Sequence, residues 1–84
     1  MYKLDLSKKV IKILAKNELL AKKFYHHVKI LLLNPFSNEL DIKKLQWETN
    51  KYRLRIWKYR FLYEIYEEKV IIYFYDAWSR WGIY

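Results

Sequence analysis

The arginines are the residues in this sequence whose type and spacing most clearly indicate chemistry. Lysines occur throughout the chain, but the four arginines all lie in its second half, at Arg53, Arg55, Arg60 and Arg80. On an extended strand Arg53 and Arg55 project from one face about 6.6 Å apart, where two planar guanidiniums can hold the oxygens of a phosphate. Trp57 follows at the same spacing and offers a ring on which a base can stack. The pattern favours a phosphate-binding surface, and a face of arginines that only keeps the sheet soluble is the competing interpretation.

Other residues that could do chemistry give weaker signals. His26 and His27 are adjacent, so on a helix their side chains point about 100° apart and do not chelate one metal ion together. The chain has no cysteine, which excludes a disulfide framework, a thiolate zinc site and a cysteine nucleophile. We therefore expect neither a metal site nor a cofactor.

Length, charge and composition limit the class of protein. A chain of 84 residues suffices for one domain, which we place at residues 1–84, and it excludes a multi-domain enzyme. A net charge of +8 favours nucleic acid or an acidic partner, and a hydrophobic content of 54% favours a folded chain over a disordered one. No apolar stretch approaches the roughly 18 residues needed to cross a bilayer, and no targeting segment is recognisable. We expect a cytoplasmic protein that does not associate with membranes.

The first half of the chain carries helical spacing. Ser7 is a good N-cap for a helix from about Lys8 to Lys16, because its hydroxyl can accept a backbone N–H of the first turn. A second helix is expected from about Glu18 to Leu33, with apolar residues at spacings of three and four. Asn34–Pro35 ends it, because proline disfavours helical geometry in the residue before it. Two helices joined by so short a break at Asn17 should form a hairpin.

The second half is rich in aromatic and β-branched residues, which suit strands. Including a short strand near the start, the expected strands are Tyr2 to Leu6, Lys51 to Trp57, Tyr59 to Tyr66 and Lys69 to Asp76. The last three are connected by one or two residues, so neighbours must be antiparallel, and Phe36 to Asp41 is expected to be a polar loop. Leu54 and Ile56 should face away from the arginine pair. The predicted fold class is α+β, with the N-terminal helical hairpin packed on a small antiparallel sheet.

The ordered combination of these segments resembles a known family. The carrying residues are Tyr52-Arg53-Leu54-Arg55-Ile56, then Tyr59-Arg60-Phe61-Leu62-Tyr63-Glu64-Ile65, and finally Ser79-Arg80 with the terminal Tyr84. They are similar to segments of the RelE/ParE superfamily of toxins from type II toxin–antitoxin systems, and closer to its RelE branch. The resemblance covers nearly the whole chain. It implies a RelE-like toxin fold and, for that branch, an endoribonuclease that cuts messenger RNA in the ribosomal A site.

The resemblance also implies a mechanism and partners. Cleavage in the RelE branch uses the 2′-hydroxyl of the RNA as nucleophile, leaves a cyclic phosphate and requires no metal. The implied partners are the ribosome, messenger RNA and a cognate antitoxin that wraps the toxin and covers its arginines. We expect the free toxin to be a monomer and its complex with the antitoxin to be a hetero-oligomer.

Residue roles are carried over position by position from the resemblance. The catalytic set consists of four residues, Arg55, Arg60, Arg80 and Tyr84. The resemblance implies that Arg60 binds phosphate, that Arg80 protonates or stabilises the leaving oxygen, and that Tyr84 stacks on or orients the nucleotide. The RNA-binding set is Lys51, Arg53, Trp57 and Lys58. An arginine has a pKa of up to about 13.8, so deprotonating one at pH 7 costs roughly 9 kcal/mol, and Arg55 is a poor general base. The proton of the 2′-hydroxyl then goes to water, to a phosphate oxygen, or to another group, for which the candidates nearest in sequence are Lys51, Lys58 and Glu64.

Three positions depart from the family pattern and leave other functions open. Trp47 and Trp57 stand where many members have glycine, and Ser79 stands where many have histidine. One alternative is a ParE-like protein that inhibits DNA gyrase without nuclease activity, because that branch needs no complete acid–base set. Another is a non-toxic binding module that kept the scaffold.

Overall fold

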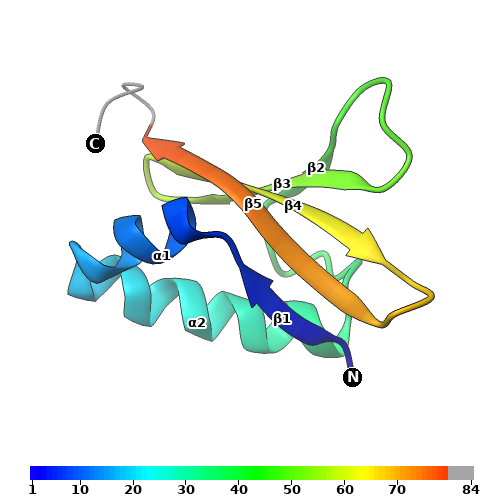
Figure 1. Ribbon diagram of the computed structural model, residues 1–84, viewed down its shortest axis with the longest axis horizontal. Coiled ribbons are helices and arrows are strands. Elements are labelled where there is room, and N and C mark those ends of the chain that lie inside the picture. Colours follow the sequence, from blue (N-terminus) through cyan, green and yellow to red (C-terminus); the bar gives the residue numbers. More distant parts are fainter. Residues whose placement is uncertain (80–84) are drawn as a thin grey trace.

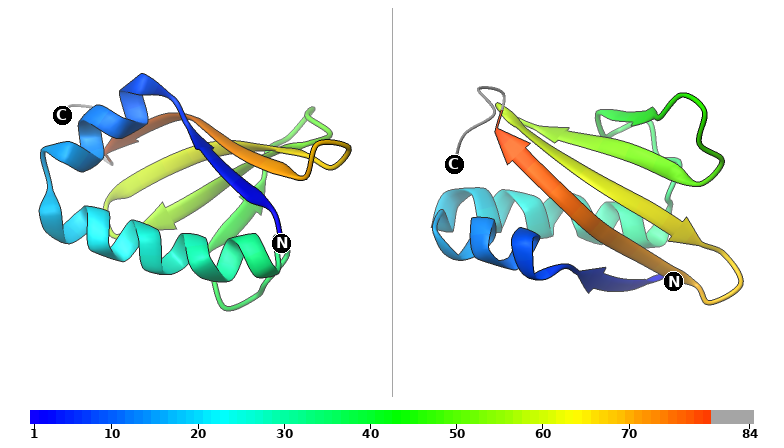
Figure 2. Two further views of the ribbon diagram at one scale, coloured as in Figure 1. Left: turned by 60° about the horizontal axis from the view of Figure 1, so that its bottom comes forward. Right: turned by 45° about the horizontal axis from the view of Figure 1, so that its top comes forward.

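The computed structural model describes residues 1–79 as two helices packed on one face of a five-stranded sheet (Figure 1). In chain order the elements are β1 (Lys3–Leu6), α1 (Lys8–Ala15), α2 (Glu18–Leu33), β2 (Ile42–Lys44), β3 (Lys51–Ile56), β4 (Tyr59–Tyr66) and β5 (Ile71–Ser79). Figure 2 shows both helices on the same side of the sheet. The predicted α+β fold, with a helical hairpin covering one sheet face, is confirmed.

Local capping residues define the two helices. The hydroxyl of Ser7 accepts a hydrogen bond from the backbone N–H of Val10 at 3.3 Å, and the side chain of Asn17 accepts one from Leu20 at 3.0 Å. Asn17 therefore begins α2 directly after α1, and the two helices form the expected hairpin. Helix α1 ends at Ala15, one residue earlier than expected, and α2 ends before Asn34 as predicted.

The sheet is mixed, which corrects the prediction of an antiparallel sheet. Its strand order is β1-β5-β4-β3-β2, and β1 runs parallel to β5 while all other neighbours are antiparallel. Strands β1 and β2 lie at opposite edges, so the two helices that connect them cross the whole sheet and cover one of its faces. The helical crossover carries the chain from β1 to the far edge of the sheet, and the strands that follow bring β5 back beside β1 as its parallel neighbour.

Four strand boundaries differ from those expected, the first of them at β1, which begins at Lys3 and not at Tyr2. Strand β3 ends at Ile56, because Trp57 has a φ of 55° and leaves the extended region. The β4–β5 turn is longer than Glu67–Glu68: the N–H of Val70 bonds to the carbonyl of Glu67, and Val70 itself has a φ of 56°. Strand β5 consequently begins and ends later, at Ile71–Ser79. Strand β2 was not expected at all.

The core lies between the helices and the sheet. Phe24 of α2 contacts two strands at once, with ring centroids 4.7 Å from Phe61 of β4 and 5.0 Å from Phe74 of β5. Leu54 and Ile56 of β3 point into this layer and are buried, as predicted, whereas Arg55 between them is exposed. The opposite face of the sheet is therefore left open for charged residues. Within residues 1–79, no helix has the length and apolar character needed to span a membrane.

Candidate nucleic-acid interface

The strand register gathers basic side chains on the open face of the sheet. Arg55 and Arg60 are direct partners across β3 and β4, and partners in an antiparallel pair point to the same side. One row further along, Arg53 is the partner of Lys43 on β2. The structure thus brings together three of the four arginines predicted from the sequence. We call Lys43, Arg53, Arg55 and Arg60 the basic face.

Asp41 holds the arginine pair in place. One oxygen of its carboxylate lies 2.9 Å from Nη2 of Arg53, and the other lies 2.6 Å from Nε of Arg55. Its backbone carbonyl also accepts the N–H of Arg55 at 3.0 Å. The two guanidiniums are therefore fixed side by side by one carboxylate, which also offsets part of their charge.

Sequence reasoning missed Asp41, which was expected only as the end of a polar loop. Arg53 and Arg55 follow Asp41 by twelve or more positions in the sequence. The pairing of β2 with β3 brings them into contact with it. No spacing rule connects an aspartate and an arginine so far apart. The unexpected strand β2 is the signal that would have placed Asp41 beside the pair.

Arg53 keeps donor capacity after its ion pair with Asp41. Its Nε is buried and has no hydrogen-bond partner among the residues that the structure describes. An unsatisfied buried donor is costly, and donors of this kind are expected to find an acceptor. Arg55, by contrast, has a side chain that is 51% exposed, so about half of it faces solvent.

Lys51 and Glu64, two of the candidates for a general base, lie together but away from Arg55 and Arg60. They are direct partners across β3 and β4. Lys51 is four residues from Arg55 on the same strand, which corresponds to about 13 Å. Its ammonium lies 3.7 Å from Glu48 and 5.6 Å from the ring of Tyr75.

Glu64 is engaged by a tyrosine. Its carboxylate accepts the hydroxyl of Tyr66 at 2.5 Å, and this hydrogen bond is the main cause that raises the pKa of Tyr66 above its usual value. A carboxylate that is held in this way and lies so far from Arg55 and Arg60 is badly placed to take a proton beside them.

Trp57 and Lys58 occupy the turn between β3 and β4. The expectation that Trp57 shares the face of Arg53 and Arg55 is wrong, because its positive φ ends the alternation of the strand. Its ring instead lies 5.5 Å from the ammonium of Lys23 on α2, the helix on the other side of the sheet. Lys58 lies 5.7 Å from the ring of Tyr59.

The remaining predicted site residues, Arg80 and Tyr84, lie outside the described residues. Among residues 1–79 no group of three or more His, Cys, Asp or Glu side chains is arranged to hold a metal ion. The rings of His26 and His27 are 6.2 Å apart with an interplanar angle of 78°, and Nδ1 of His27 lies 2.8 Å from the carbonyl of Lys23 within its own helix.

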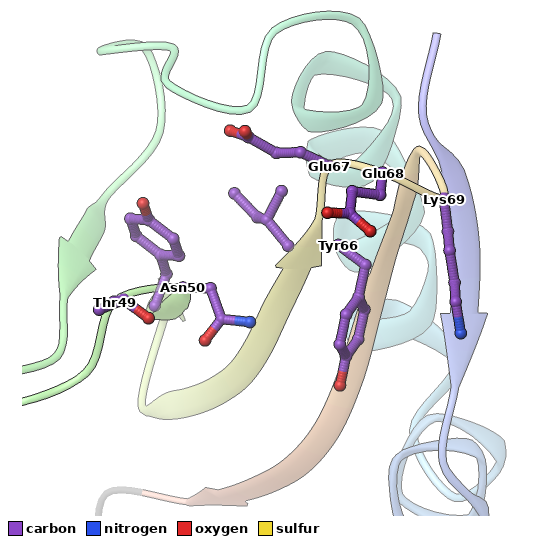
Figure 3. Close-up of a pocket in the computed structure, with 8 residues that line it drawn as sticks. Thr49, Asn50, Tyr66, Glu67, Glu68 and Lys69 are labelled. Carbon is purple, nitrogen blue, oxygen red and sulfur yellow. The ribbon is translucent and has the colours of Figure 1, made fainter.

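Two cavities lie outside the basic face. One of about 440 Å³ separates Thr49 and Asn50 from the β4–β5 turn, which carries Glu67 and Glu68 (Figure 3). These two carboxylates disfavour a phosphate there. Another cavity, of about 300 Å³, lies against α1 and the start of β4 and is lined by Lys9, Lys12, Ile13, Lys16, Asn17 and Tyr59. It carries positive charge, but Lys9 is already paired with Asp76 at 2.7 Å.

Comparisons with known proteins find relatives by structure and not by sequence. No family model and no curated protein matches this sequence. An archaeal RelE–RelB complex from Pyrococcus horikoshii contains a chain that is similar with a TM-score of 0.82, at 24% identity and with 94% of each chain covered. The isolated RelE toxin of E. coli is similar with a TM-score of 0.78, at 20% identity, over 94% of this chain and 84% of that one.

A RelB–RelE antitoxin–toxin complex from Methanococcus jannaschii gives a TM-score of 0.72 at 24% identity, with 90% of each chain covered. Near-complete coverage in both directions means that the likeness extends to every layer of the domain and is not limited to a shared hairpin. The resemblance inferred from the arginine-bearing strands is thereby confirmed at the level of structure: this chain has the fold of the RelE toxins.

Proposed function

We propose that this protein is the toxin of a toxin–antitoxin system and that it cuts messenger RNA bound to the ribosome in the cytoplasm. The observation that carries the proposal is the basic face, in which Arg53, Arg55 and Arg60 meet on the open side of a RelE-type fold. A net charge of +8 adds a general attraction for RNA. The structures with the same fold include a protein named as the RelE toxin of E. coli.

Arg55 and Arg60 are the residues proposed to bind the scissile phosphate. As direct cross-strand partners their β-carbons are separated by about 4.5–5.5 Å, close enough for both guanidiniums to reach one phosphate. Preorganised guanidiniums stabilise the negative charge that develops on the pentavalent phosphorus in the transition state. Loss of one such donor typically lowers the rate by about 10²- to 10³-fold.

In the proposed reaction the 2′-oxygen of the RNA attacks the adjacent phosphorus. The bond from 2′-oxygen to phosphorus forms, the bond from phosphorus to the 5′-oxygen breaks, and the products are a cyclic phosphate and a free 5′-hydroxyl. Arg55 remains protonated throughout, for the energetic reason given above. Lys51 and Glu64 lie about 13 Å along the strands from Arg55 and Arg60. We therefore assign the proton of the 2′-hydroxyl to water, to a phosphate oxygen, or to Lys58 in the turn between the two arginine-bearing strands.

Arg80 and Tyr84 complete the proposed catalytic set on the strength of the sequence resemblance. Arg80 is assigned to the leaving 5′-oxygen, and Tyr84 to the orientation of the nucleotide. Replacing Arg80 by alanine, or deleting Tyr84, should abolish toxicity while the thermal midpoint stays nearly unchanged, because a residue that acts only on the substrate contributes little to folding stability. A combined fall of stability and activity would assign both residues to packing instead.

A cognate antitoxin is the proposed partner. Chains of the same fold from Pyrococcus horikoshii and Methanococcus jannaschii are found in complexes with RelB. The basic face offers a complementary surface to an acidic or amphipathic segment, which would cover the arginines and block RNA. We expect the free toxin to be a monomer and the antitoxin complex to be a hetero-oligomer.

The proposal is tested by inducing expression in cells, measuring protein synthesis and mapping the ends of transcripts. We expect translation arrest and new ends within translated messages. Arg55→Ala should suppress both, whereas Lys29→Ala, which removes one positive charge from the exposed surface of α2, should not. Intact transcripts with normal protein synthesis would overturn the proposal. Intact transcripts combined with inhibited supercoiling by purified gyrase would replace it with the ParE-like function.

A further inference from the structure

Trp47 is the most exposed large hydrophobic residue that the structure describes. Its exposed fraction is 96%, and it lies in the loop between β2 and β3, which we call the β2–β3 loop and define as Leu45–Asn50. Figures 1 and 2 show this loop projecting from the sheet, away from both helices. The N–H of Leu45 bonds to the carbonyl of Lys51 at 3.0 Å and closes the base of the loop.

The backbone conformation of Trp47 is also unusual. Its φ is 69°, in the left-handed region, where a residue with a β-carbon is strained and a glycine is not. Trp57 also has a positive φ, but its ring contacts Lys23 within the protein. Within residues 1–79 the Trp47 ring takes part in no stacking or cation–π contact, and its side chain is almost fully exposed. Residues held in such conformations often have a function outside the fold.

The charges around the loop indicate what kind of partner it contacts. Lys43 and Lys44 lie on β2 at one end of the loop, and Lys51 begins β3 at the other end. Lys43 is the cross-strand partner of Arg53, so the positive charge continues from the loop into the basic face. Glu48, the one acidic residue of the loop, lies 3.7 Å from Lys51 and neutralises only part of this charge.

An exposed ring beside clustered cations suits single-stranded nucleic acid better than a protein. Bases stack on aromatic side chains while lysines follow the backbone phosphates. A peptide partner would need a contiguous apolar patch, but apart from Leu45 the neighbours of Trp47 in the loop are polar: Gln46, Glu48, Thr49 and Asn50.

We infer that the β2–β3 loop is a second RNA contact, in which Trp47 stacks on an unpaired base whose flanking phosphates lie along Lys43 and Lys51, which project from the same face as Arg53. The choice of RNA rests on the proposed function, but the contact itself requires no cleavage. It extends the substrate surface from the basic face to the loop and gives the protein a hold on nucleotides away from the scissile phosphate.

The test measures binding of purified protein to a fluorescein-labelled, unstructured RNA of about ten nucleotides by anisotropy. Trp47→Ala should weaken binding by about 5- to 150-fold, the loss expected for one stacked base. Trp47→Phe, which keeps a ring, should retain most of the affinity. Trp47→Gly should lose affinity as the alanine variant does and should also unfold at a higher temperature, because glycine removes the strain. The control is Leu19→Ala, which truncates another exposed apolar residue on α2.

The salt dependence separates this contact from the arginines. Trp47→Ala removes no charge, so the slope of log affinity against log salt should stay as in the wild type, whereas loss of a phosphate contact reduces it. Equal RNA affinity of the wild type and Trp47→Ala would overturn the inference.

Failure of the inference is distinct from failure of the proposed function. Cleavage that requires Arg55, together with RNA affinity that does not require Trp47, would reject only the loop contact. RNA binding that depends on Trp47 without any cleavage in cells would support the loop contact and reject the nuclease.

Discussion

The two faces of the sheet differ sharply in the burial and charge of their side chains. Towards the helices, Leu54 and Ile56 of β3 are buried with almost no exposed area, and the layer around them is aromatic and aliphatic. Away from the helices, Arg53 and Arg55 of the same strand carry charge and meet Asp41. Adjacent positions on one strand thus belong to the core and to the charged face in turn, because successive side chains point to opposite faces. Stability and RNA affinity should therefore respond separately to mutations one residue apart.

The largest effect is expected in the aromatic layer, from Phe24→Ala. Phe24 is fully buried and joins α2 to Phe61 and Phe74, so its truncation leaves a cavity between the helices and the sheet. We expect a loss of about 3–5 kcal/mol in the free energy of unfolding, measured by urea denaturation. Phe36→Ala, at a residue that is 60% exposed, should cost much less. Equal losses for the two variants would contradict the division between the faces.

The next largest effect is expected from mutations on the open face of the sheet. The double variant Arg53→Ala with Arg55→Ala should weaken RNA binding by about 10- to 100-fold, because two charge-assisted contacts to phosphate are lost. The slope of log affinity against log salt should become shallower by about 1.4, which is 0.7 for each phosphate contact to a single strand. The free energy of unfolding should change by about 1 kcal/mol or less, since the ion pairs with Asp41 are partly exposed. An unchanged salt slope would show that the pair does not contact phosphate.

Tyr63 places a buried polar group, its hydroxyl, on the apolar face of the sheet. It is fully buried against Tyr52, and its hydroxyl has no hydrogen-bond partner among the described residues. Tyr63→Phe should therefore leave the free energy of unfolding at pH 7 unchanged or raise it by about 1 kcal/mol. Thermal or urea unfolding measures this directly. A loss of 2 kcal/mol or more, on the order of the penalty for an unpaired buried group, would mean that the hydroxyl is bonded.

Tyr63 should also shape the alkaline limit of stability. Burial, with a smaller contribution from Tyr52, raises its pKa well above the ordinary value of 10.0. The folded protein then holds the proton while the unfolded chain releases it, so this contribution is fully present below pH 10 and is lost as the pH rises further. Unfolding measured between pH 9 and about 11.5 should show a shallower decline for Tyr63→Phe than for the wild type. Tyr25→Phe, on the exposed surface of α2, is the control for removing a tyrosine hydroxyl as such.

The smallest effect is expected at Asp41, and its two consequences have opposite signs. Asp41→Asn removes the negative charge that both guanidiniums face, so RNA affinity should rise by about two- to fivefold. The same change should lower the free energy of unfolding by about 1 kcal/mol or less, the range of an exposed ion pair. Glu39→Gln controls for net charge, because it removes a nearby exposed carboxylate that is not in contact with the pair. Equal gains in affinity for both variants would mean that net charge, and not Asp41 itself, limits binding.

Much of the fold could be predicted from the sequence because the decisive interactions are local. Ser7 and Asn17 cap the helices through residues three positions away, and Pro35 ends α2 at the residue before it. The antiparallel neighbourhood of β3 and β4 is equally local, since only a two-residue turn separates the two strands. These features follow from capping, proline geometry and the alternation of a strand, which act over a few residues.

The tertiary structure decided the features that depend on distant partners. The parallel pairing of β1 with β5, and the unexpected strand β2, are set by hydrogen bonds between segments far apart in the chain. The positive φ of Trp57 turned its ring towards Lys23, which no alternation rule anticipates. Asp41 reaches Arg53 and Arg55 only after β2 has joined the sheet. The sequence by itself thus determined which residues carry the charge and on which face of β3 they lie, whereas long-range pairing alone decided which of those charges are neutralised, because electrostatic contacts depend on distance in space and not on separation along the chain.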